Sequence, residues 1–169
     1  MKAIERAVGA TATALAVGGL CVLLILAAFT LLDGLLRAVA NHPLDIVREI
    51  GDLVAAICGA CCLPIVLLHK GNITLRVFDR LVRASAVRAI DAFADLLVEI
   101  VMIAMAWQFC LYSIKTMRAG DVTWLLNLPK APFWFAVDAV LWIAVAVQTF
   151  ALVRTLAGSA RARPSETPP

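Results

Sequence analysis

The chain has 169 residues, of which 63% are hydrophobic, and its mean hydropathy is +0.94. Soluble domains average about 45–50% apolar residues, so a soluble domain of this length has no interior large enough to hide these side chains. The net charge is only +3, and the basic residues gather in a central stretch and near the two ends, which fits contact with anionic lipid better than with nucleic acid. The sequence predicts an all-α integral membrane protein with four transmembrane helices.

The first predicted span covers residues 8–32, within a run that contains no charged side chain. A helix rises 1.5 Å per residue and needs about 20 residues to cross the hydrocarbon layer, so this run is long enough. Ala10, Ala14 and Gly18 recur every four residues and give the helix one small face. That face is either a seam for close helix packing or a consequence of the high alanine and glycine content.

A polar connection is expected over residues 33–52, with a turn at Asn41-His42-Pro43, because proline lacks an N–H and restricts the residue before it. The second predicted span covers residues 46–68. Arg37 and Glu49 flank the turn. They either bridge the ends of the first two spans, contact a partner or remain as solvated charges.

The central connection, residues 69–91, holds five basic residues against two acids. Within it, apolar residues at helical spacing predict a short basic amphipathic helix over residues 73–84. This helix either lies on lipid headgroups or packs on a partner protein.

The third and fourth spans are predicted over residues 92–114 and 131–156, and the connection between them, which contains Trp124, is expected to dip into the membrane interface. Residues 1–158 then form a single membrane domain. Residues 159–169 are rich in Pro, Ser and Arg and are expected to be a disordered tail.

Four spans place both termini and the central connection on one side of the membrane. That side carries ten Lys and Arg residues, and the other side carries five. The positive-inside rule therefore predicts cytoplasmic termini.

Three acids, Asp95, Glu99 and Asp138, lie in or near the third and fourth spans. Ionisable residues at such depth are costly to desolvate and often functional. They indicate either a small self-sufficient oligomeric carrier, or structural ion pairs and partner contacts; Arg37 and a partner residue are both candidates to pair with Asp138.

Cys58 and Cys61 form a C-x-x-C motif inside the second span, which raises the alternative of a membrane thiol oxidoreductase. Such an enzyme needs an accessible thiol of lowered pKa, and apolar burial acts in the opposite direction. Packing is therefore the favoured role for these cysteines. The sequence offers no metal-ligand spacing, phosphate-binding glycine loop or catalytic triad, and we expect no cofactor and no enzymatic activity.

One ordered set of residues resembles the small permease subunits of tripartite ATP-independent periplasmic (TRAP) transporters. In that family an Arg ends the first span, an Asn-x-Pro turn follows, and a Trp and paired Glu residues open the second span. Four positions match in order: Arg37, Asn41, Pro43 and Glu49. Two depart, because Ile46 occupies the Trp position and Arg48 replaces the first Glu.

The resemblance continues through Gly59, through the basic stretch with Gly71 and Arg76, and through Pro129-Lys130-Ala131-Pro132 before the fourth span. Asn72-Ile73-Thr74 stands where the family carries a histidine. By this resemblance, Arg37, Glu49, Gly59, Gly71 and Arg76 are structural or partner-interface candidates. Asp138 is a further candidate, because it is an ionisable residue inside the fourth span.

The resemblance implies a subunit of the bacterial inner membrane that supports a large multi-span membrane subunit and does not itself carry substrate. In such a complex, a periplasmic binding protein delivers an organic acid and sodium drives its uptake. The implied partners are these two proteins and membrane lipid, with no nucleic acid.

Overall fold

The computed structural model describes residues 2–40, 45–68 and 84–161, and these form four helices. They are α1 (Lys2–Ala40), α2 (Asp45–Leu68), α3 (Ala84–Ala119) and α4 (Ala131–Arg161). Each contains a stretch long and apolar enough to cross a membrane. Within the described ranges the backbone forms no strand, only one isolated bridge between Val122 and Pro129. The predicted all-α fold with four membrane-crossing helices is confirmed.

Three helices extend beyond the spans predicted for them. The first span is predicted to end at residue 32, but α1 continues to Ala40. Asp33 and Arg37 lie one turn apart on this extension and form an ion pair that is compatible with a helix. α3 spans Ala84–Ala119 instead of 92–114, so it includes part of the predicted central connection. α4 reaches Arg161, so the first three residues of the expected disordered tail are helical. Most of the predicted basic helix, residues 73–83, lies outside the described residues.

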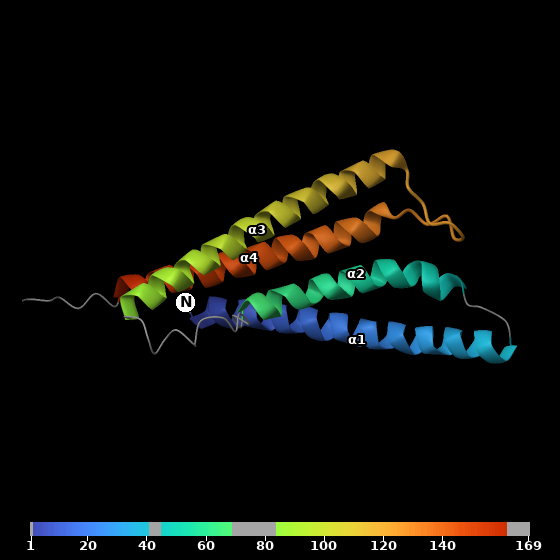
Figure 1. Ribbon diagram of the computed structural model, residues 1–169, viewed down its shortest axis with the longest axis horizontal. Coiled ribbons are helices and arrows are strands. Elements are labelled where there is room, and N and C mark those ends of the chain that lie inside the picture. The colour runs from blue at the N-terminus through green and yellow to red at the C-terminus, as the bar shows by residue number, and fades with distance from the viewer. Residues whose placement is uncertain (1, 41–44, 69–83, 162–169) are drawn as a thin grey trace, which may run out of the picture.

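The helices pack in the order α1, α2, α4, α3, since α1 contacts α2, α2 contacts α4 and α4 contacts α3. Figure 1 shows α1 and α2 as one pair and α3 and α4 as the other, with the α3–α4 loop at the end away from the N-terminus. We call this end the loop end. At the opposite end, Arg154 Nη1 of α4 lies 2.9 Å from Glu5 Oε1 of α1. The start of α1 and the last part of α4 therefore lie at the same end of the bundle, as an even number of membrane crossings requires.

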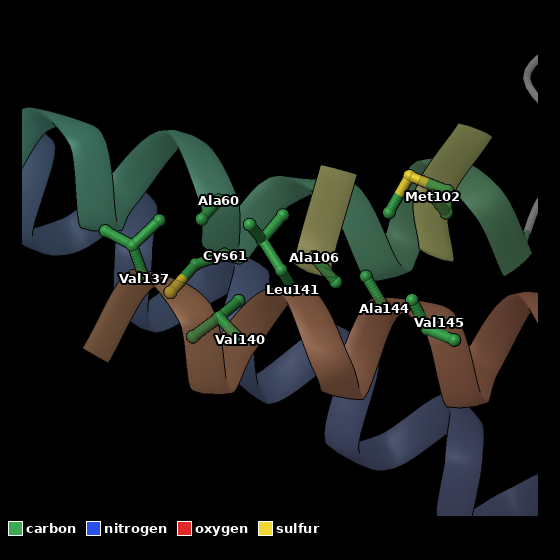
Figure 2. Packing of buried hydrophobic residues seen from close by; sticks show 9 residues of the cluster. All are labelled: Ala60, Cys61, Met102, Ala106, Val137, Val140, Leu141, Ala144 and Val145. Carbon is green, nitrogen blue, oxygen red and sulfur yellow. The ribbon is translucent and has the colours of Figure 1, made fainter. Parts of the chain in front are cut away.

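The core lies where α4 meets α2 and α3. Its buried side chains are mostly small or β-branched, which lets the three backbones approach closely. Figure 2 shows all nine: Ala60, Cys61, Met102, Ala106, Val137, Val140, Leu141, Ala144 and Val145. α4 supplies five of them and is the central helix of the bundle.

The contact between α1 and α2 uses a face of α1 other than that of Ala10, Ala14 and Gly18. Gly19 is buried against α2, where an added Cβ would lie 2.8 Å from Cys61 Cβ and 3.2 Å from the Cys58 carbonyl oxygen. Ala12 and Ala16 are buried on the same side. Ala10, Ala14 and Gly18 are exposed, so the face that they form takes no part in packing within the described part of this chain. Both faces carry small residues three or four positions apart, and only the position of α2 distinguishes them.

Candidate functional site

The loop between α3 and α4 is a compact hairpin with defined ends. Gly120 adopts a φ of 66° and ends α3, with Gly120 N–H donating to Met117 O and Asp121 N–H to Thr116 O. This is the Schellman arrangement, in which a left-handed glycine allows two N–H groups to satisfy the last helical carbonyls. Farther along, Thr123 N–H donates to Leu128 O at 2.9 Å, and Leu128 N–H donates back to Thr123 Oγ1 at 3.0 Å.

Glu49 fastens this hairpin to α2. Its Oε1 accepts the Leu125 N–H at 2.7 Å and its Oε2 accepts the Leu126 N–H at 3.1 Å. Two donors to one ionised carboxylate form a charge-assisted, two-point contact. The hairpin and α2 are more than 70 residues apart in sequence, so the side chain of Glu49 links distant segments at the loop end.

Arg37 does not form the expected bridge to Glu49. Its Nη2 lies 3.6 Å from Asp33 Oδ2 on the same helix, and its side chain is 49% exposed. Glu49 instead uses both carboxylate oxygens on the hairpin. The two residues that flank the first turn therefore have separate local roles, and Arg37 presents an exposed guanidinium at the loop end.

Asp138 lies in the α3–α4 interface and is only 7% exposed. The thiol of Cys110 on α3 is its hydrogen-bonding side chain, and its Oδ1 has no partner among the described residues. One turn earlier on α4, the Trp134 ring packs edge-on against Tyr112 with centroids 5.3 Å apart. The expected pairing with Arg37 is absent between these described residues, because Arg37 is held by Asp33.

The other two intramembrane acids fasten α3 to α4. Thr155 donates to Asp95 Oδ2 at 2.6 Å, and Thr149 donates to Glu99 Oε1 at 2.7 Å. Gln148 also donates to the main-chain carbonyl of Asp95 at 3.2 Å. Both acids are at least nine-tenths buried, so these hydrogen bonds offset part of the cost of removing them from water.

The three acids do not converge on one site. Thr149, which binds Glu99, lies eleven residues beyond Asp138, or about 16 Å along α4 at the helical rise. Among the described residues, no group of three or more His, Cys, Asp and Glu side chains is placed to hold a metal ion. The acids form a dispersed polar seam between α3 and α4.

Residues 26–161 match the sequence profile of the family described as Tripartite ATP-independent periplasmic transporters, DctQ component. The chain belongs to this family. The match begins within α1 and ends at the last residue of α4, so it includes the hairpin, the polar seam and the core. The resemblance seen in the sequence is thereby confirmed. No curated protein and no solved structure gives a match.

The protein is therefore a TRAP transporter small permease component, a multi-pass membrane protein that works with other subunits. Of its remaining candidate residues, Gly59 is exposed on α2, and a Cβ added there would have no atom within 4 Å. Packing within this chain thus does not require glycine at that position. Gly71 and Arg76 lie outside the described residues.

The cysteine pair lies inside the bundle of this TRAP component. Cys58 is 3% exposed and Cys61 is 8% exposed, and Cys61 belongs to the core between α2 and α4. Both are free thiols. A thiol that exchanges with a partner must be accessible, so this placement favours packing over redox chemistry.

Sequence reasoning missed the residues that partner the acids. Cys110, Gln148, Thr149 and Thr155 are the polar side chains opposite them in the α3–α4 seam. The signal was present, since polar residues in an otherwise apolar span usually face another helix. Ser113, fully buried in the same interface, follows this rule as well.

Proposed function

We propose that this TRAP small permease component is a scaffold that supports a large multi-span membrane subunit and does not itself carry the solute. The complex would import an organic acid delivered by a periplasmic binding protein, with sodium as the driving ion, in the bacterial inner membrane. The termini would lie in the cytoplasm and the loop end would face the periplasm, as the distribution of Lys and Arg indicates. Family membership and the resemblance of the turn region support this proposal.

The main support for a scaffold role is that the buried acids interact with side chains of the neighbouring helix. Asp95 and Glu99 are bound by threonines of α4, and Asp138 lies beside Cys110 of α3. A carrier needs ion or substrate ligands that converge on one cavity near the middle of the membrane. Here the acids brace one pair of helices along its length, which suits a rigid part of a complex.

Exposed positions of this chain supply the proposed partner contacts. Gly59 offers a point where another helix can approach α2 closely, and Arg37 offers a guanidinium at the loop end. Gly71 and Arg76 join this proposed interface through the family resemblance, as does the basic segment 73–84, which faces either the partner or lipid. Asp138 and Glu49 do not contact the partner in this proposal. They hold in place the helices and the hairpin whose exposed residues form the interface.

The decisive test is to tag this subunit, express it with its native genomic neighbours and identify the proteins that co-purify in mild detergent. We expect one large polytopic membrane protein in a stable complex. Glu49→Lys should reduce the yield of that complex while leaving substrate preference unchanged, because the reversed charge releases the hairpin. Unchanged assembly and uptake in this variant would contradict the role given to Glu49.

Transport by the purified chain alone in liposomes would overturn the scaffold proposal and favour the small oligomeric carrier. Loss of uptake in a Cys58→Ser, Cys61→Ser double variant that still assembles would favour the thiol oxidoreductase. Neither alternative has a specific observation in its support.

A further inference from the structure

A hollow of about 600 Å³ lies at the loop end, bounded by α2, the α3–α4 hairpin and the first turn of α4. We call it the loop-end hollow. The membrane-crossing stretches of α2 and α4 begin at Ile46 and Ala131. Lining residues Leu53 and Trp134 therefore lie within about two turns of the points where these helices enter the apolar layer. The hollow therefore lies at the boundary between the headgroup region and the apolar layer.

The loop-end hollow carries two basic and two acidic side chains, from Arg48, Lys130, Glu49 and Asp52. Glu49 already accepts two hairpin N–H groups. Arg48 is exposed and forms no salt bridge within the described part of the chain. The hollow thus presents basic groups and the carboxylate of Asp52, which is free among the described residues, so it is suited to a ligand that carries one negative and one positive group.

Aromatic rings complete the walls. Trp124 stands at the rim with 94% of its surface exposed, and Tyr112 and Trp134 meet edge-to-face deeper in. Aromatic faces attract alkylammonium groups through their quadrupole. Tyr112 and Trp134 also line an adjoining groove of about 530 Å³, which continues the hollow along α3. Phe109 and Leu111 are the other apolar side chains of this groove, and Gln108 and Lys115 are its polar ones.

We propose that the loop-end hollow binds the headgroup of a zwitterionic ethanolamine phospholipid. The phosphate would contact Arg48 and Lys130, and the ammonium would lie between Asp52 and the aromatic walls. An acyl chain would follow the adjoining groove past Phe109. The inference requires only that the chain span a membrane, so its failure would leave the scaffold proposal unaffected.

The test uses the full chain purified in mild detergent with any subunits that remain bound. Native mass spectrometry measures the affinity for phosphatidylethanolamine, for phosphatidylglycerol and for soluble glycerophosphoethanolamine. Arg48→Gln removes the unpaired guanidinium, and Trp124→Ala removes the exposed ring with little effect on folding. Arg118→Gln is the matched control, because Arg118 is also an exposed arginine at the loop end but does not line the hollow.

We expect phosphatidylethanolamine to bind more tightly than phosphatidylglycerol, and to lose about tenfold in affinity in Arg48→Gln, as the loss of a charge-assisted contact implies. Trp124→Ala should weaken it as well, and Arg118→Gln should not. Soluble glycerophosphoethanolamine should bind weakly, because it lacks the acyl chain. Equal binding by all variants, or tighter binding of phosphatidylglycerol, would overturn the proposal. Cross-linking of a Trp124→Cys variant to a second polypeptide, with no lipid bound, would assign the hollow to a protein instead.

Discussion

The contact between Glu49 and the α3–α4 hairpin gives a sharp test of how the loop end is held together. Glu49→Ala removes both acceptors, at 2.7 Å and 3.1 Å, from the N–H groups of Leu125 and Leu126. A hydrogen bond to a charged group contributes about 1.5–3 kcal/mol when sheltered, and less when water can replace it. Leu125 is 63% exposed and Leu126 is half-buried, so we expect the hairpin to lose about 2 kcal/mol in total against local opening.

Amide hydrogen exchange measures this opening directly. A loss of about 2 kcal/mol raises the exchange rates of the Leu125 and Leu126 amides about thirtyfold, since 1.36 kcal/mol corresponds to a factor of ten. Glu49→Gln should show a smaller increase, because its amide retains one acceptor oxygen but turns an NH₂ group toward the other donor. Asp52→Asn is the control, as an exposed acid one turn along α2. Exchange rates in Glu49→Ala equal to those of the unmodified chain would refute the reasoning.

Three further predictions concern the packing of the helices. Gly19→Val should destabilise the protein by about 1–3 kcal/mol in a thermal or denaturant unfolding assay, because its Cβ would lie 2.8 Å from Cys61 Cβ. Gly18→Val, on the open face of α1, should have little effect. Equal losses of stability in the two variants would contradict the assigned α1–α2 interface. Thr149→Val should lower the free energy of unfolding by about 1–2 kcal/mol, the upper range for a hydrogen bond between membrane helices. Unchanged stability would show that the hydrogen bond from Thr149 to Glu99 contributes nothing. Serine at both Cys58 and Cys61 should leave solute uptake by the assembled transporter intact, and abolished uptake with normal assembly would refute their packing role.

Helix existence and type follow from the sequence because they depend on local properties. Long apolar runs can satisfy their backbone hydrogen bonds in a membrane only as helices or in closed barrels. The end points were less well determined. Asp33 and Arg37 looked like the start of a polar connection, but their spacing of four residues is compatible with a helix, and α1 continues through them as an ion-paired turn. Polarity alone does not distinguish these two outcomes.

The tertiary structure decided which helix faces meet and which polar groups pair. The sequence identified Glu49, Asp95, Glu99 and Asp138 as residues that need partners, because unpaired polar groups are costly in an apolar medium. It did not identify the partners, which lie on segments 28 to 77 residues away. The sequence by itself determined four membrane-crossing helices and the family, since both depend on residue order and hydrophobicity. Only the packing order α1, α2, α4, α3 selected the face containing Gly19 and brought the hairpin to Glu49, because such pairings depend on the relative position and rotation of whole helices.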